Sequence, residues 1–111
     1  MNSRLDEILA ALADPTRRAI VDQLARHPMR SGELADRIGS SASTMSRQLQ
    51  LLRRHGLVDE RHDLDDARIR LYSLNEAPLR DLSDWLEETR RFWGEQLDSF
   101  RQHVEQRERQ R

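Results

Sequence analysis

The sequence contains no cysteine, no lysine and no long hydrophobic run. Without cysteine, the chain has no disulfides, no thiolate metal ligands and no cysteine nucleophile. The N-terminal residues lack the apolar core of a signal peptide, and no apolar stretch approaches the length that crosses a bilayer. We therefore expect a cytoplasmic protein with no membrane partner.

Charge is abundant but balanced, because 19 arginines face 20 acidic residues and leave a net charge of −1. No overall basic field draws such a chain to nucleic acid, so any attraction of that kind must be local. The 111 residues suit one domain, 1–111. With a mean hydropathy of −0.90, the chain has little apolar surface for a core. We expect part of that surface to be buried between subunits.

Apolar residues at helical spacing predict two helices in the first 28 residues. The first helix follows Asn2 or Ser3, either of which can serve as its N-cap. Asp14 caps the second helix, and Pro15 then occupies the first helical position, where its missing N–H costs nothing. Pro28 is expected to stop this helix.

A short third helix and a longer fourth helix follow. Ser31 is the expected N-cap of the third helix, and Gly39 ends it. Ser40 or Ser41 caps the fourth helix, 42–55, which ends at His55. The inner face of this helix is apolar: Ala42, Met45, Leu49 and Leu52. A short helix, a glycine turn and a longer helix together form a helix-turn-helix pattern.

After Gly56 the hydrophobic period changes, and residues 57–62 and 68–74 read as the two strands of a hairpin. Asn75 and Pro78 mark the start of a last helix. Its apolar stripe is too long for so small a domain to bury alone, so we expect a homodimer. The last helix supplies the predicted interface residues Leu82, Leu86, Phe92, Trp93, Leu97 and Phe100.

The run Ser40–Val58 contains three arginines but no Asp or Glu, although the composition of the chain would place roughly three acids there. On a helical wheel the polar residues lie opposite the apolar face. They are the groups that read base edges in a DNA major groove. Four of them lie directly opposite, Ser43, Arg47, Gln50 and Arg54, and three flank these, Thr44, Ser46 and Gln48. A solvated polar helix with no DNA-binding role is the alternative interpretation.

Three further arginines are candidates for contact with the DNA backbone. Arg54 lies near the end of the fourth helix. Arg68 and Arg70 are two residues apart in the second predicted strand, so one face can carry both while Ile69 and Leu71 pack inward. The alternative is that Arg68 and Arg70 pair with the acids of the hairpin tip, Asp63, Asp65 or Asp66.

The chain resembles the ArsR family of bacterial winged helix-turn-helix repressors. The matching motifs are Asp14-Pro15-Thr16-Arg17, Gly32-Glu33-Leu34-Ala35, the frame Ser46…Leu49…Leu52…Gly56-Leu57-Val58, and Leu71-Tyr72-Ser73-Leu74. The resemblance implies a mainly α fold with a small β-hairpin wing. It also implies a homodimer built from the first and last helices, which adds Leu5, Ile8 and Leu12 to the predicted interface. Helices 42–55 and wings 58–74 would then bind a near-palindromic double-stranded DNA operator. By position, the resemblance makes five residues the base-reading candidates: Ser43, Thr44, Ser46, Arg47 and Gln48. The family often has Gln at the position of Ala42 and His at that of Arg47, which suggests a different operator.

The metal-sensing residues of many relatives are missing. The segment Gly32–Gly39 has no cysteine, and the last helix has only His103 near its end. We expect no cofactor and no metal. His62 with Asp63 and Asp65 is a weaker alternative for a surface metal site, and an unidentified effector or partner protein stays open. A protein-interaction module is the rival from another class. No catalytic triad or phosphate loop is present, so we expect no enzyme activity.

Overall fold

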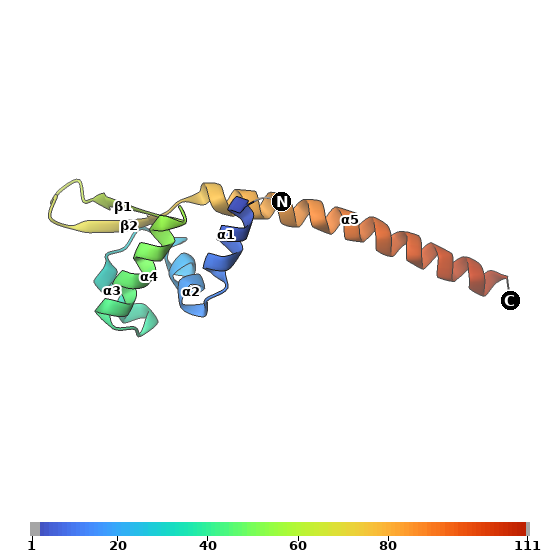
Figure 1. Ribbon diagram of the computed structural model, residues 1–111, viewed down its shortest axis with the longest axis horizontal. Coiled ribbons are helices and arrows are strands. Elements are labelled where there is room, and N and C mark those ends of the chain that lie inside the picture. The colour runs from blue at the N-terminus through green and yellow to red at the C-terminus, as the bar shows by residue number, and fades with distance from the viewer. Residues whose placement is uncertain (1–2, 111) are drawn as a thin grey trace. The chain divides into compact units, whose positions relative to one another are not determined.

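The computed structural model describes residues 3–110, which form five helices and one hairpin (Figure 1). Their bounds are α1 Ser3–Leu12, α2 Pro15–Leu24, α3 Ser31–Ile38, α4 Ala42–Arg54, β1 Val58–His62, β2 Arg70–Leu74 and α5 Glu76–Arg109. This order confirms the predicted mainly α fold with a two-stranded hairpin. The chain divides into two compact units, one ending at Arg80 and one beginning at Asp81.

The start of α2 follows the prediction. The Asp14 side chain accepts a hydrogen bond from the backbone N–H of Arg17 at 3.0 Å, and Pro15 is the first helical residue. The end of α2 differs, because the helix stops at Leu24 and a turn occupies the residues before Pro28. The prediction that Pro28 stops the helix is therefore wrong. The proposed N-cap Asn2 lies outside the described residues, and Ser3 is already part of α1.

The turn between α3 and α4 depends on Gly39. Its φ of 80° lies in the left-handed region, and its N–H donates to the carbonyl of Ala35 at 2.8 Å. Ser41 then caps α4, since its hydroxyl accepts from the N–H of Thr44 at 3.1 Å. Both features were predicted. The cap predicted for α3 was wrong, because Ser31 is its first helical residue and Arg30 holds the N-cap position without a side-chain hydrogen bond.

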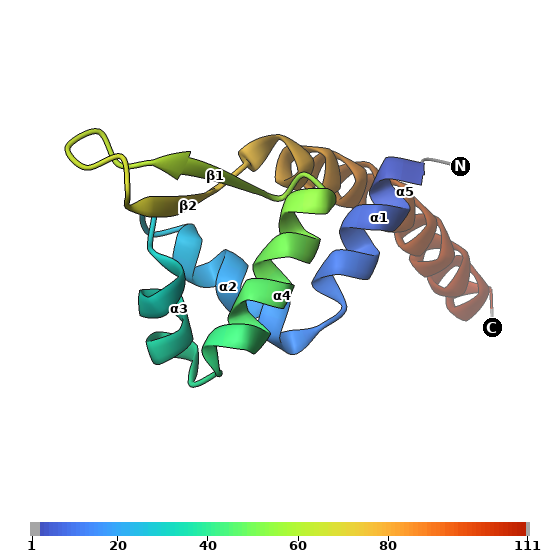
Figure 2. The ribbon, with the colours of Figure 1, turned by 60° about the vertical axis from the view of Figure 1, so that its left-hand side comes forward.

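The core of the first unit lies where α2, α3 and α4 meet below the hairpin (Figure 2). The most deeply buried large side chains are Ile8, Ile20, Met29, Leu34, Met45, Leu49, Leu52, Leu57 and Val58. Burying an aliphatic side chain of this size stabilises a fold by about 1.5–3 kcal/mol. Ala42 is exposed in the first turn of α4, so that helix buries three of the four residues predicted for its inner face.

The hairpin pairs β1 with β2 in antiparallel register, with Val58 opposite Leu74 and His62 opposite Arg70. An isolated antiparallel bridge also forms on β2. In it, Tyr72 of β2 and Met29 exchange two backbone hydrogen bonds of 2.8 and 3.0 Å. The hairpin is thereby joined to the segment between α2 and α3.

The second strand is shorter than predicted. It begins at Arg70, because a turn around Asp66 and Arg68 closes the hairpin tip. Arg68 therefore lies in a turn, and the prediction that it shares a strand face with Arg70 is wrong. Leu71 was expected to pack inward, but it is only half-buried and lines a hollow at the hairpin tip.

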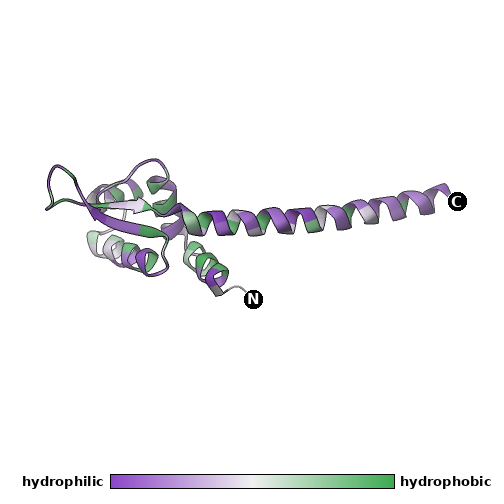
Figure 3. Ribbon diagram, turned by 90° about the horizontal axis from the view of Figure 1, so that it is seen from above, coloured by the Kyte–Doolittle hydropathy of each residue, from purple (hydrophilic) through white to green (hydrophobic). Residues whose placement is uncertain are grey.

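Helix α5 begins where predicted, with the Asn75 side chain accepting from the N–H of Ala77 at 3.2 Å. Green hydrophobic segments recur along this helix among purple hydrophilic ones (Figure 3). None of the helices in residues 3–110 combines the length and hydropathy that a bilayer crossing needs.

The Asp14 cap predicts a loss of stability on substitution. Asp14→Ala leaves one N–H of the first turn of α2 without its acceptor, and we expect the free energy of unfolding to fall by about 1 kcal/mol. Urea denaturation at fixed protein concentration measures this change. Asp22→Ala is the matched control, since Asp22 is exposed on the same helix and caps nothing. Equal stability of the two variants would contradict the role of Asp14.

Candidate nucleic-acid interface

The outer face of α4 is a polar, acid-free surface. Ser43, Thr44, Ser46 and Arg47 are all exposed, and they lie on the sides of the helix away from the buried Met45. Within residues 3–110, the Arg47 guanidinium has neither an ion-pair nor a hydrogen-bond partner. This arrangement presents a charged donor and several hydroxyls to solvent, with no carboxylate on the helix to repel a phosphate.

Hydroxyl groups gather at the N-terminus of α4. The Ser41 hydroxyl donates to the Thr44 hydroxyl at 2.9 Å and lies 3.3 Å from that of Ser43. The positive end of the helix dipole lies at the same place. A phosphate or a base-edge acceptor is the kind of group that this end of the helix favours.

Gln48 differs from the other four base-reading candidates, because it is half-buried and already bonded. Arg17 at the start of α2 donates from Nη1 to the Gln48 side-chain oxygen at 3.1 Å. The same guanidinium donates to the carbonyls of Ala11 at 2.6 Å and Ala10 at 3.2 Å, at the end of α1. Sequence analysis did not identify this role of Arg17. The motif Asp14-Pro15-Thr16-Arg17 marked the residue only through the family resemblance.

Glu60 joins the end of α4 to the hairpin. Its carboxylate pairs with Arg53 of α4 and, at 3.3 Å, with Arg70 of β2. The Glu60 side chain is only 15% exposed, whereas Arg53 and Arg70 are each about half exposed or more. Arg70 was expected to contact DNA or to pair with the hairpin-tip acids, and in the structure its partner is Glu60. Sequence analysis missed Glu60 because its partners are distant along the chain.

Arg68 pairs with a hairpin-tip acid, as the alternative interpretation predicted. Its Nε and Nη2 atoms each donate to the Asp66 carboxylate at 3.1 Å. These hydrogen bonds hold the pKa of Asp66 below its ordinary value. Arg54, the third backbone candidate, is exposed and pairs with no residue in the described part of the chain.

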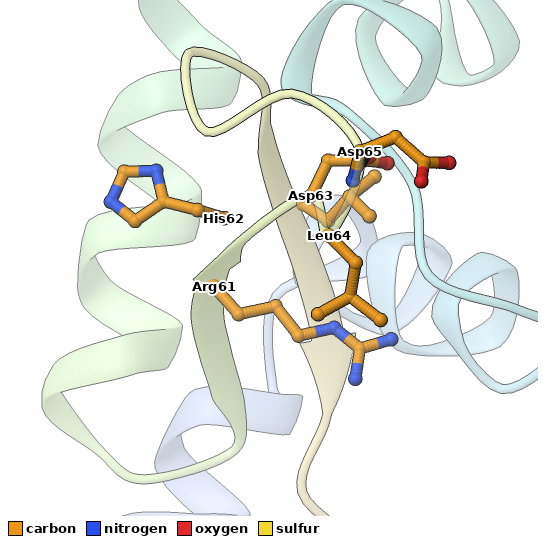
Figure 4. Close-up of a pocket in the computed structure, with 6 residues that line it drawn as sticks. Arg61, His62, Asp63, Leu64 and Asp65 are labelled. Atoms are coloured by element: carbon orange, nitrogen blue, oxygen red, sulfur yellow. Dashed lines mark hydrogen bonds between the residues drawn. The ribbon is translucent and has the colours of Figure 1, made fainter.

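The hollow at the hairpin tip does not assemble the metal site considered for His62, Asp63 and Asp65. Figure 4 shows the His62 ring on one side of the strand and the two aspartates, with Leu64, on the other. The Asp63 carboxylate instead accepts from the N–H groups of Asp65 and Asp66. Across residues 3–110, no three side chains with metal-ligating groups come together.

The residues predicted for the dimer interface fall into two groups. Leu5 and Ile8 are buried within the monomer, and Leu12 is half-buried. Leu5 and Ile8 pack into the core of the monomer, so most of their side-chain surface is already covered, and their part in an interface stays a prediction. Leu9 is the exposed leucine of α1. On α5, Leu82 is half-buried, whereas the other five predicted residues are exposed: Leu86, Phe92, Trp93, Leu97 and Phe100.

Comparison with known sequences shows which proteins this chain is similar to. A family model described as a helix-turn-helix domain matches residues 12–61. The chain is 36% identical over 100 residues to the HTH-type transcriptional regulator Rv2034 of Mycobacterium tuberculosis, covering 90% of this chain and 88% of the relative. It is 28% identical over 82 residues to the transcriptional repressor SdpR of Bacillus subtilis, covering 74% and 88%. These relatives are transcriptional regulators, not enzymes.

Solved structures agree with the sequence comparison. An ArsR-like transcriptional regulator from Rhodococcus sp. RHA1 superimposes with a TM-score of 0.77 at 27% identity, covering 93% of this chain and 92% of that chain. The homodimeric winged helix-turn-helix DNA-binding domain of Mb0332 from Mycobacterium bovis gives a TM-score of 0.62 at 26% identity, covering 78% and 80%. The hairpin therefore corresponds to the wing of this fold.

The position of Glu60 predicts a change in salt dependence. Glu60→Gln removes the charge that holds Arg53 and Arg70, so both become available to phosphates. We expect the plot of log affinity for duplex DNA against log salt concentration to become steeper, by about 0.9 for each arginine that reaches a phosphate. A fluorescence-anisotropy salt titration measures this slope.

Glu87→Gln is the control, because it removes the same charge from an ion pair on α5. If Glu60→Gln and Glu87→Gln give the same slope as the unmodified protein, Glu60 does not restrain the two arginines.

Proposed function

The chain belongs to the ArsR family of winged helix-turn-helix DNA-binding transcriptional regulators, and we propose that it represses transcription as a homodimer on a near-palindromic operator. The single observation that carries this proposal is the outer face of α4. That face is exposed and free of acid, and it presents Arg47 without an internal partner. It lies on the second helix of the helix-turn-helix, the one that enters the major groove in such folds.

Base reading is assigned to the first two turns of α4. Arg47 suits guanine, whose O6 and N7 accept two hydrogen bonds from a guanidinium. The hydroxyls of Ser43, Thr44 and Ser46 can donate to or accept from base edges. Gln48 lies beside them at the edge of the buried face.

Contact with the DNA backbone is assigned to Arg54, Arg68 and Arg70. Arg54 is free to reach a phosphate directly. Before they can bind a phosphate, Arg68 must leave its ion pair with Asp66 and Arg70 must leave its ion pair with Glu60. The arginine side chains of both pairs are mostly exposed to solvent. Exposed pairs contribute about 0–1 kcal/mol each, so a phosphate can compete with them.

The dimer is assigned to the terminal helices, mainly α5. Six apolar side chains keep to one face over two eleven-residue periods, about six helical turns: Leu82, Leu86, Trp93, Leu97, Phe100 and Val104. A repeat of 11 residues has 3.67 residues per turn, which keeps a stripe nearly parallel to the helix axis and suits pairing with a second helix. Residues 1–111 then act as one DNA-binding domain per subunit.

Repression follows from occupancy. A dimer that covers an operator overlapping a promoter excludes the polymerase, and this needs no further activity of the protein. The relative SdpR is named a transcriptional repressor, and the neighbour Mb0332 is described as homodimeric. Release from DNA would require an effector, a partner protein or dilution of the dimer.

Arg47→Ala tests base reading by α4. We expect operator affinity to fall by about 1–3 kcal/mol and base preference to relax at one position of each half-site. Binding to single-base operator variants measures both effects. Arg26→Ala removes the same charge from an exposed site outside α4, and should leave base preference unchanged. Unchanged affinity and preference in Arg47→Ala would refute the assignment of Arg47.

Phe100→Glu tests the dimer. The substitution places a charge in the middle of the apolar stripe, where burial against a second copy would require its desolvation. We expect light scattering at micromolar concentration to show a shift from dimer to monomer. Gln102→Glu adds the same charge on the opposite face of α5 and should stay dimeric. A monomeric unmodified protein would contradict the proposed assembly.

A further inference from the structure

One guanidinium connects the end of α1 to α4. Arg17 donates to the Ala10 and Ala11 carbonyls with two of its nitrogens and to Gln48 with the third. Arg17 and Gln48 are 31 residues apart in the chain. The two carbonyls anchor the arginine on one side, so the nitrogen that faces Gln48 is held in place.

This contact determines which atom of the Gln48 amide faces inward. A guanidinium carries only donors and no acceptor. The amide atom beside Arg17 must therefore be the oxygen, and the NH₂ group must point away from Arg17. Gln48 is half-buried, so its side chain has limited room to turn. Thr44, one turn earlier on α4, and the neighbouring Arg47 are both exposed.

A glutamine with a free amide pairs with adenine by accepting from N6 and donating to N7. While its oxygen is turned toward Arg17, Gln48 presents only its NH₂ group to a base, so it does not form this two-bond pair. Guanine and thymine carry a carbonyl oxygen in the major groove at the place where adenine and cytosine carry an amino group. An NH₂ group that faces this place donates to the carbonyl oxygen of guanine or thymine, whereas it meets the amino group of adenine or cytosine donor to donor.

We propose that Arg17 holds the Gln48 amide with its NH₂ group toward the DNA, so that the protein selects a keto base, guanine or thymine, at one position of each half-site. Arg17 is thus a positioning residue for base specificity and contacts no DNA itself. The inference rests on the proposed function, since it requires α4 to read bases.

Arg18 provides a matched control within the same structure. Its Nη1 donates to the Leu12 and Ala13 carbonyls at 2.7 and 3.1 Å, so it also binds the C-terminal end of α1. Both acceptors lie within six residues of Arg18 along the chain, and within residues 3–110 the Arg18 side chain bonds to no residue of α4. If Arg17 acted only by stabilising the end of α1, substitution of Arg18 would have the same effect on DNA binding.

The experiment is selection of bound sequences from a random duplex library, with the unmodified protein and three variants. The unmodified protein is expected to prefer a keto base roughly fivefold or more at the Gln48 position. Gln48→Glu keeps an acceptor for Arg17 but has no donor, so we expect the preference to invert to adenine or cytosine. Arg17→Met frees the amide to turn, so adenine is accepted together with the keto bases. Arg18→Met keeps the unmodified preference.

The outcomes separate this inference from the proposed function. If the unmodified protein enriches a palindromic sequence but Gln48→Glu keeps the same preference at every position, the inference is wrong and the function stands. If Arg18→Met relaxes preference as Arg17→Met does, the effect comes from the end of α1 and the inference is likewise wrong. If the unmodified protein enriches no sequence, both fail. Thermal unfolding of each variant reports whether it is folded. If Arg17→Met is too unstable to test, the base preference of Gln48→Glu still decides whether the inference is right.

Discussion

The burial of Met45, Leu49 and Leu52 fixes the rotation of α4 about its own axis, and the rest of the surface depends on that rotation. With 3.6 residues per turn, these three side chains share one face, and Arg47 is then directed to solvent. Ser41 and Gly56 set the two ends of the helix. If other residues of α4 were the buried ones, the helix would be rotated about its axis and its outer face would point in another direction relative to the wing. This holds whichever polar residues the outer face carries.

Seven arginines of the first unit fall into three groups by their partners. Arg17 and Arg18 satisfy carbonyls at the end of α1, and Arg53, Arg68 and Arg70 pair with acids. Arg47 and Arg54 have no partner in the described part of the chain. A planar guanidinium with five donors can bind several acceptors at once, which a compact lysine ammonium matches less well. One residue type thus serves both the fold and the proposed DNA-binding surface.

Helix α5 carries the largest exposed apolar surface of the described chain. Its seven large apolar side chains that face solvent are between 37% and 66% exposed: Trp85, Leu86, Phe92, Trp93, Leu97, Phe100 and Val104. A patch of this kind on a polar helix is typical of an interaction surface. In the proposed dimer these side chains become buried, so the stability of α5 depends on protein concentration. In this proposal one chain carries both the DNA-binding helix α4 and the dimer helix α5.

Local signals were sufficient for the elements of the fold but not for the contacts of the site. The sequence alone determined the helix ends at Asp14, Gly39 and Ser41, because these follow from capping chemistry. It also determined which face of α4 is buried and which is polar, because this follows from the spacing of residues along a helix. Tertiary structure alone decided that Glu60 holds Arg53 and Arg70, and that Arg17 orients Gln48. The reason is physical: a cap depends on backbone geometry within one turn, whereas an ion pair between elements depends on how those elements pack. With 19 arginines and 20 acids in the chain, the sequence permits many pairings, and only the folded arrangement selects among them.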